Sequence, residues 1–192
     1  MAITIKNSPR LSYRFMDQND TEKLFELDQD EDVMRYINGG KKTTREDIEQ
    51  RFLPRFSAYR NPNTGWGLWQ VNTLNDDLFI GWVLVRPMGF FDGEDMSDEK
   101  SGRNDRDLEI GWRFKKLSWG KGYATEAAKQ VANAISSQSD IDSFCAIADS
   151  DNFASISIMK KMGMRYIKTE NHPISPVGVD LYRANIGELV TE

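Results

Sequence analysis

The sequence contains few of the residues that build disulfides and metal centres. Among its 192 residues there is one cysteine, Cys145, and one histidine, His172. A disulfide within the chain and a thiolate zinc site each need more than one cysteine. Both are therefore excluded, and so is a metal site rich in histidine. A site made only of carboxylates is not excluded by this count, but we expect no bound metal.

An excess of basic residues and a long apolar run are also missing. Lysine and arginine number 25 against 30 aspartates and glutamates, so the net charge is −5. Proteins that bind duplex nucleic acid usually present a basic face, and no nucleic-acid partner is expected. No apolar stretch approaches the length of a membrane span, and the N-terminal residues lack the apolar core of a signal peptide. We expect a cytoplasmic protein with no membrane partner.

The remaining composition is typical of a globular protein. Hydrophobic residues make up 39% of the chain and charged residues 29%, and the length suits a single domain, residues 1–192. Periodicity predicts strands at 3–6, 10–15, 66–73, 78–85, 108–114, 143–148, 165–169 and 179–184, and helices near 21–27, 33–37, 44–53, 124–135 and 153–162. This order predicts an α/β (α+β) fold with a central mixed sheet flanked by helices. Residues 87–107 are acidic, contain glycines and show no period, so we expect a long exposed loop there.

One segment, 108–128, combines a strand, a turn and a helix. Apolar and polar residues alternate from Leu108 to Phe114, which is the period of a strand. The turn Trp119–Gly122 breaks this period, and small and aliphatic residues then recur at helical spacing. A helix that begins after small residues presents unpaired N–H groups and the positive end of its dipole. The turn is therefore a candidate phosphate site, although the turn taken alone favours a plain strand–helix connection.

The same turn resembles the central motif of the GNAT superfamily of acetyl-CoA-dependent N-acetyltransferases. That motif reads Gln/Arg-x-x-Gly-x-Gly/Ala; Gly122 and Ala124 match it, whereas Trp119 departs from it. The run GKGYATEA at 120–127 is typical of the Rim-like branch, the ribosomal-protein N-terminal acetyltransferases and their relatives. A second motif, N-x-x-S at 152–155 followed by KKMGM at 160–164, resembles the same branch. The order of elements matches from about residue 10 to about residue 185.

This resemblance implies a splayed, mostly antiparallel sheet that binds acetyl-CoA in the opening between two strands. The pyrophosphate would lie on Trp119, Gly120, Lys121, Gly122, Tyr123, Ala124 and Thr125. The pantetheine would lie along the preceding strand, where the amide of Phe114 would face the thioester carbonyl. Asn152 would bond to the pantetheine. A dinucleotide-binding turn is a poorer alternative, because Thr125 replaces the third glycine of that motif.

Direct acetyl transfer to an amine needs a base for the amine and a proton for the leaving thiolate. Glu109 is the candidate base on the strand beside the cleft, although a solvated or ion-paired glutamate fits the pattern equally well. His172, in a predicted loop, is the second candidate. Many family members place a tyrosine acid on the second helix, but the matching residue here is Met159, so Ser155 is the candidate acid. Asn152 and Ser155 are also suited to capping that helix.

The acceptor is the part of the function that the sequence determines least. Cys145 is expected to be buried and inert in an apolar strand, which argues against an acyl-cysteine intermediate. In the family, the helix pair that includes 31–36 borders the acceptor site, and the acidic loop would attract a cationic acceptor unless it is merely solvated. We expect a protein or peptide N-terminal amine as acceptor. The alternatives are a small amine (a polyamine, an amino-acid analogue or an antibiotic) and a catalytically silent acyl-CoA-binding module. The resemblance also allows a homodimer.

Overall fold

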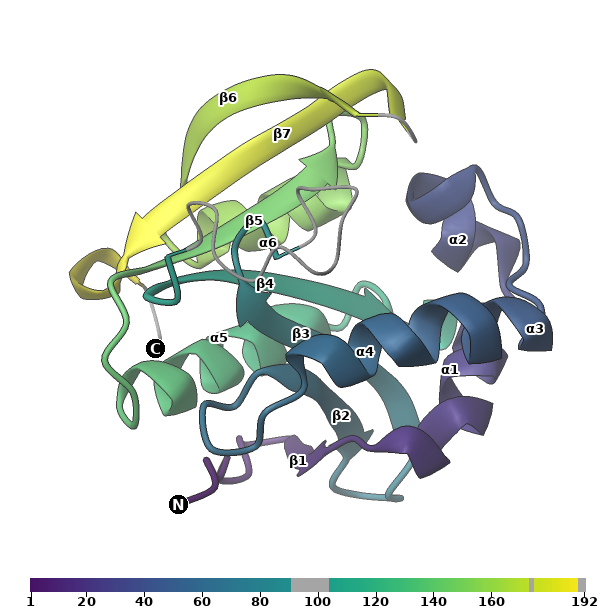
Figure 1. Ribbon diagram of the computed structural model, residues 1–192, viewed down its shortest axis with the longest axis horizontal. Helices are drawn as coiled ribbons and strands as arrows, with labels where there is room; N and C mark the ends of the chain where they lie inside the picture. Colours follow the sequence, from purple (N-terminus) through teal and green to yellow (C-terminus); the bar gives the residue numbers. More distant parts are fainter. Residues whose placement is uncertain (91–103, 173–174, 190–192) are drawn as a thin grey trace.

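A seven-stranded sheet organises the chain, and the computed structural model describes residues 1–90, 104–172 and 175–189 (Figure 1). The strands are β1 (Leu11–Phe15), β2 (Gly67–Thr73), β3 (Phe79–Pro87), β4 (Asp107–Phe114), β5 (Ser143–Asp149), β6 (Arg165–His172) and β7 (Ser175–Asn185). Their order in the sheet is β1-β2-β3-β4-β5-β7-β6. Neighbours are antiparallel except β4 and β5, which are parallel. The predicted mixed, mostly antiparallel sheet flanked by helices is confirmed.

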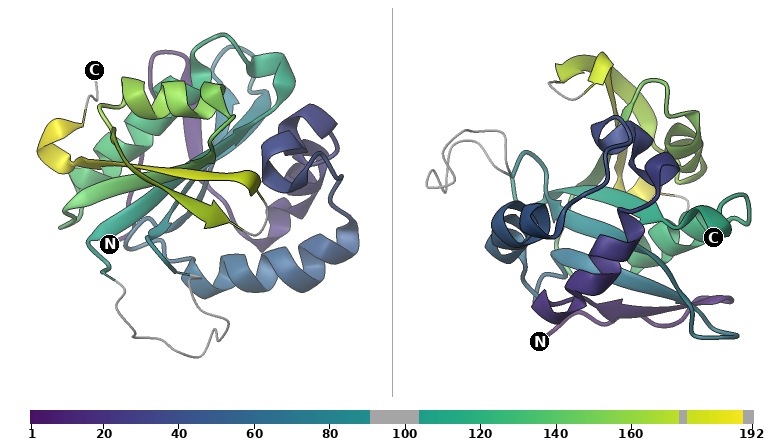
Figure 2. Two further views of the ribbon diagram at one scale, coloured as in Figure 1. Left: turned by 90° about the horizontal axis from the view of Figure 1, so that it is seen from above. Right: turned by 90° about the vertical axis from the view of Figure 1, so that its right-hand side faces the viewer.

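Helices cover both faces of this sheet. They are α1 (Thr21–Leu27), α2 (Glu31–Asn38), α3 (Arg45–Asp47), α4 (Leu53–Tyr59), α5 (Tyr123–Ser136) and α6 (Phe153–Lys161). A π-helical segment, η2 (Ile48–Phe52), joins α3 to α4, and short 3₁₀ turns occur at η1 (Gln18–Asp20), η3 (Lys116–Ser118) and η4 (Ile186–Glu188). The right-hand view in Figure 2 shows α4 and α5 on opposite faces. Among the described helices, none is long and apolar enough to cross a membrane.

Each face of the sheet has its own hydrophobic core. On one face α5 lays a row of buried alanines and aliphatic residues against the strands, and α6 joins the same cluster. On the other face α1, α2 and α4 enclose a second cluster with Trp82 and Leu84 of β3. β3 contributes to both clusters, which explains why its sequence is apolar almost throughout. We call the second surface the α1–α4 face.

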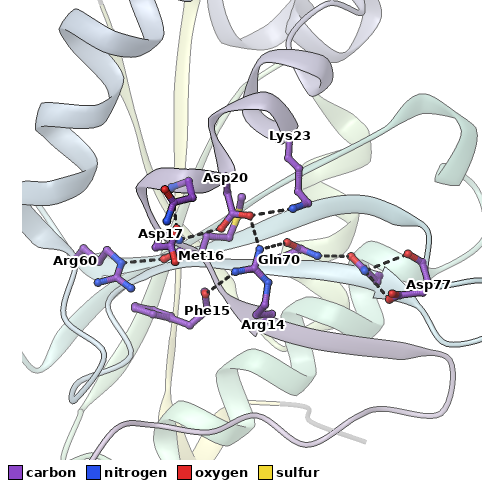
Figure 3. Close-up of polar contacts among 11 residues, drawn as sticks. Arg14, Phe15, Met16, Asp17, Asp20, Lys23, Arg60, Gln70 and Asp77 are labelled. Atoms are coloured by element: carbon purple, nitrogen blue, oxygen red, sulfur yellow. Dashed lines mark hydrogen bonds and ion pairs between the residues drawn. The ribbon is translucent and has the colours of Figure 1, made fainter.

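A polar network fixes the start of α1 to the edge of the sheet (Figure 3). The guanidinium of Arg14 in β1 donates to Gln70 of β2 and forms an ion pair with Asp20. Asp20 is buried and also accepts from the Lys23 ammonium at 2.9 Å and the Asp17 N–H at 3.0 Å. Burial disfavours the ionised carboxylate, but these hydrogen bonds outweigh it and hold the pKa of Asp20 below its usual value.

The strand predicted at 3–6 is wrong. This segment instead lies along α5, and glutamine side chains in α5 and just after it form hydrogen bonds with its backbone. Gln138 bonds to both the N–H and the carbonyl of Thr4, and Gln130 donates to the Lys6 carbonyl. Because these side chains take the place of a neighbouring strand, the segment needs no partner in the sheet.

The two predicted loops have different outcomes. Strand β3 extends to Pro87 and β4 begins at Asp107, and residues 91–103 of the acidic loop lie outside the described part of the chain.

The loop predicted around His172 is wrong, since β6 and β7 pair as a hairpin as far as His172 and Ser175. Pairing of β7 with β5 begins only at Val179, so the earlier part of β7 is locally an edge strand, where a proline is tolerated. The side chain of His172 is outside the described structure.

Candidate active site

The parallel strands β4 and β5 separate soon after they meet. They pair only at 107–109 with 143–145, whereas β5 continues along β7 to Asp149. The N–H of Lys115, just beyond β4, bonds to Ile80 of β3 at 2.8 Å. Since successive N–H groups in a strand point to opposite edges, the Phe114 N–H points away from β3 and into the gap beside β5. The Phe114 side chain is buried in the core of the α5 face, so its amide and its ring have separate environments.

The turn after β4 has the geometry of an anion site. Gly120 and Gly122 have φ angles of +73° and +78°, a left-handed conformation that side-chain-bearing residues rarely adopt. Gly122 is the N-cap of α5, and no described side chain caps this end, so the N–H groups of its first turn remain open to a ligand. The indole of Trp119 donates to the Phe114 carbonyl at 2.9 Å and ties the turn to the strand. We call residues 119–125 the cofactor turn, after the role that the resemblance implies for them.

An arginine that the sequence analysis missed supports the cofactor turn. Arg10 donates to the Lys121 carbonyl at 2.9 Å, and its guanidinium lies 4.6 Å from the centre of the Tyr123 ring. It also forms a 2.7 Å ion pair with Glu126 in the first turn of α5, which accepts from Ser8 as well. Burial works against ionisation of Glu126, but the Ser8 and Arg10 hydrogen bonds prevail and lower its pKa. The pair neutralises a carboxylate that would otherwise repel a phosphate.

Helix α6 reaches the gap from the side of β5. Asn152 caps it by accepting from the Ser155 N–H at 3.2 Å, so the predicted capping role is confirmed. The Ser155 hydroxyl oxygen accepts a 3.3 Å hydrogen bond from the indole of Trp112 in β4. This bond joins the two sides of the gap and leaves the hydroxyl proton of Ser155 for another acceptor. Met159 is 1% exposed and lies in the core, so this position presents no polar group to the gap.

Glu109 lies on the α1–α4 face in an ion pair. It is 8% exposed, and both its oxygens accept from the Arg86 guanidinium of β3, at 2.7 and 3.0 Å. The guanidinium also lies 5.8 Å from the centre of the Tyr59 ring, and burial raises the pKa of that phenol. The sequence analysis gave an ion-paired glutamate as one alternative for Glu109, and the structure shows this ion pair. The Arg86 guanidinium therefore occupies one position on each oxygen of Glu109.

Cys145 is buried, as predicted. It lies in β5 with 4% of its surface exposed, and burial raises the pKa of its thiol. A buried thiol with a raised pKa is a poor nucleophile. In the part of the chain that is described, no group of three potential metal-ligating side chains comes together.

A pocket opens beside the end of β4, next to the helix pair that the resemblance places at the acceptor site. Its volume is about 450 Å³, and it is lined by Glu26, Leu27, Asp30, Val33, Lys115, Lys116 and Leu117. Acidic side chains come from the α1–α2 segment, and basic ones come from the segment after β4. Within 31–36, Asp32 pairs with Lys116 and Arg35, and the Tyr36 ring is exposed. The pocket therefore has mixed charge.

Comparison with known proteins decides the family. Residues 10–165 match the model described as "Acetyltransferase (GNAT) domain". The chain belongs to the GNAT acetyltransferase family. The uncharacterized protein YkkB of Bacillus subtilis is similar, with 29% identity over 173 residues, which cover 88% of this chain and 90% of YkkB.

Solved structures share the GNAT fold. The crystal structure of a GNAT-family acetyltransferase from Bacillus anthracis superposes with a TM-score of 0.69 and 24% identity, and covers 98% of this chain and 100% of that chain. Spermidine N-acetyltransferase from Vibrio cholerae, in complex with CoA and spermine, gives 0.70 and 12% identity, with 94% and 98% covered. Because it belongs to the GNAT family, the protein is an acetyl-CoA-dependent N-acetyltransferase. Its place in the Rim-like branch stays a prediction.

Proposed function

We propose that this GNAT enzyme transfers acetyl directly from acetyl-CoA to the primary amine of a protein or peptide N-terminus. The observation that carries the direct route is the gap between β4 and β5, which opens beside the uncapped start of α5. The burial of Cys145 supports transfer without an acyl-enzyme. The acceptor class rests on the resemblance of the GKGYATEA run to the Rim-like branch.

In this proposal the cofactor turn binds the pyrophosphate through the amides from Gly120 to Thr125. The glycines let the backbone approach the phosphates, and the dipole of the 14-residue helix α5 adds to the attraction. The pantetheine follows β4 in the gap, within reach of Asn152 at the start of α6. This placement brings the thioester toward the Phe114 N–H and the Ser155 hydroxyl.

The chemistry forms one bond and breaks another. The amine nitrogen attacks the thioester carbon, the C–N bond forms, and the Phe114 N–H stabilises the oxyanion that develops on the carbonyl. The C–S bond then breaks as the thiolate takes the proton of Ser155, and the Ser155 oxygen takes the remaining excess proton of the attacking nitrogen. The amine loses its proton to Glu109, directly or through water. An α-amino group has a pKa of about 8, so a weak base is sufficient.

A thiol-release assay with purified protein and a panel of amines tests the proposal. The panel contains N-terminal peptides of ribosomal proteins, spermidine, spermine, an amino-acid analogue and an aminoglycoside. We expect turnover with the peptides. Preference for the polyamines would favour the second candidate, a small-amine acetyltransferase, which the spermine-bound V. cholerae structure supports.

Variants separate catalysis from binding. Glu109→Gln and Ser155→Ala should each lower kcat by about 100-fold and leave the Kd for acetyl-CoA unchanged. Ser157→Ala, an exposed hydroxyl on the same helix, is the matched control and should behave as wild type. Binding of acetyl-CoA without turnover of any amine would favour the silent acyl-CoA-binding module. Absence of acetyl-CoA binding would contradict the proposal as a whole.

A further inference from the structure

Ion pairs hold the end of β4 to the α1–α2 segment. Three basic residues at or just after the end of this strand each contact an acid between α1 and the start of α2. The pairs are Arg113–Asp28, Lys115–Glu26 and Lys116–Asp32. We call this set the β4 clamp. It links the helix pair on the α1–α4 face to the strand end that leads into the cofactor turn.

The Arg113–Asp28 pair differs from the other two because it is buried. The two side chains are 14% and 10% exposed. Asp28 also accepts from the Thr43 hydroxyl at 2.7 Å, and the Arg113 guanidinium lies 5.0 Å from the Trp82 ring. Asp28 is therefore held by Arg113 and Thr43, and Arg113 is held between Asp28 and the Trp82 ring. Such a pair contributes little net stability but holds its members in one geometry.

Two buried N–H groups at this pair lack hydrogen-bond partners in the described part of the chain, which is unfavourable for folding. The Nε of Arg113 and the indole N–H of Trp82 are both buried, and neither has a hydrogen-bond partner among the described residues. Leaving a buried donor without a partner is unfavourable, because the donor has lost its hydrogen bonds to water. Unsatisfied groups of this kind are rare in native proteins and gather where function constrains the geometry.

Arg113 directly precedes Phe114, whose N–H faces the gap. The Arg113 carbonyl and the Phe114 N–H belong to one planar peptide unit, so the backbone at Arg113 sets the direction of this N–H. We propose that Asp28 and Arg113 are positioning residues for acetyl transfer: they hold the Phe114 amide in line with the developing oxyanion and couple the α1–α2 segment to the cofactor gap. This inference rests on the proposed function.

The key variant is Asp28→Asn, which keeps the size and the Thr43 contact but removes the charge that orients Arg113. Oxyanion stabilisation acts only in the transition state. We therefore expect kcat to fall by about 10- to 100-fold, with the Kd for acetyl-CoA and the KM for the best amine of the panel within about threefold of wild type. Arg113→Lys should retain more of kcat than Arg113→Met.

A matched control removes a similar but exposed charge pair. Asp140→Asn breaks the exposed ion pair of Asp140 with Arg106, which lies just before the starts of β5 and β4, at the end of these strands opposite Phe114, and should leave kcat unchanged. Thermal unfolding of each variant reports stability separately. If Asp28→Asn does not fold, Thr43→Val removes only the hydroxyl that orients Asp28, and kcat should fall by about two- to fivefold.

A spectroscopic readout distinguishes this inference from the proposed function. In ¹⁵N-labelled protein, CoA should shift the Phe114 amide resonance of wild type, and Asp28→Asn should reduce that shift. Absence of any shift in wild type would contradict the cofactor placement itself. A normal wild-type shift together with wild-type kcat in both Asp28→Asn and Thr43→Val would overturn the positioning role. A loss of kcat that merely follows the loss of thermal stability, with no gain from Arg113→Lys, would also overturn it.

Discussion

The cofactor turn and the α1–α4 face are built in different ways. The turn at 119–125 presents backbone N–H groups, which glycines and the start of α5 place beside the gap. The α1–α4 face presents paired side chains, among them Arg86 with Glu109 and Arg113 with Asp28. A backbone site depends on residues adjacent in sequence, whereas a site made of ion pairs depends on contacts between distant segments.

This difference has a functional consequence. Backbone amides suit a cofactor whose phosphates are the same in every reaction. Side-chain pairs are easily changed by substitution and suit the part of an enzyme that distinguishes acceptors. Variants on either side of the gap should therefore differ both in the size of their effects and in the property that they change.

The largest effect is expected at the buried ion pair. Arg113→Met leaves the Asp28 carboxylate buried with the Thr43 hydroxyl as its remaining described partner. We expect the free energy of unfolding to fall by about 3–5 kcal/mol, measured by urea denaturation. The double variant Asp28→Leu with Arg113→Met should recover much of this loss, because no unpaired charge remains. A loss below about 1 kcal/mol in the single variant would show that the pair is solvated.

A smaller loss is expected at Asp20, which fixes α1 to the sheet on the same face. Asp20→Asn removes the charge that Arg14 and Lys23 contact and should cost about 2 kcal/mol near neutral pH. The folded state lowers the pKa of Asp20, so its contribution is complete above the unfolded value of about 4 and is lost as the pH falls through the folded value. The difference between wild type and variant should therefore shrink below about pH 4 in denaturation curves. A difference that stays constant down to pH 2 would argue against linkage to this carboxylate.

On the cofactor side, Gly122→Ala tests whether the backbone conformation makes the site. A left-handed residue with a side chain costs about 1–2 kcal/mol, and the added Cβ would lie 3.4 Å from the Arg10 guanidinium. We expect acetyl-CoA affinity to fall by about tenfold in calorimetry. Gly187→Ala, at a glycine with open space and no left-handed φ, is the control. Unchanged affinity in Gly122→Ala would mean that the turn does not hold the pyrophosphate.

The sequence predicts the fold and the strand–turn–helix conformation of 108–136 for one physical reason. Strand alternation, glycine positions and helix starts are local patterns, and the run from Leu108 to Ser136 contains all of them. The resemblance implies that the strand before the turn splays from its neighbour, and the short pairing of β4 with β5 confirms this. The segment at 3–6 misleads because glutamine side chains in α5 and just after it, more than 120 residues away, take the place of a strand partner.

The side-chain contacts of the site are not readable in the same way. Glu109 pairs with Arg86 across 23 positions, and Arg113 pairs with Asp28 across 85. Neither pair has a spacing that marks it in the sequence, because register and helix packing bring the partners together. Arg10 is hidden for the same reason, 116 positions from Glu126. The one local feature that points to this ion pair is Glu126, which lies inside the matched GKGYATEA run.

The smallest effect is expected at Arg10, which supports the cofactor turn. Arg10→Met removes the one long-range ion pair described at the cofactor turn and leaves Glu126 charged beside the phosphates. Exposed pairs contribute about 0–1 kcal/mol, so acetyl-CoA affinity should fall by about two- to fivefold, and less at high salt. Adding Glu126→Gln should restore most of the affinity, because the repulsive carboxylate is gone. If the double variant binds no better than Arg10→Met, then Arg10 acts by holding the Lys121 carbonyl, and the backbone geometry of the turn itself depends on a distant side chain.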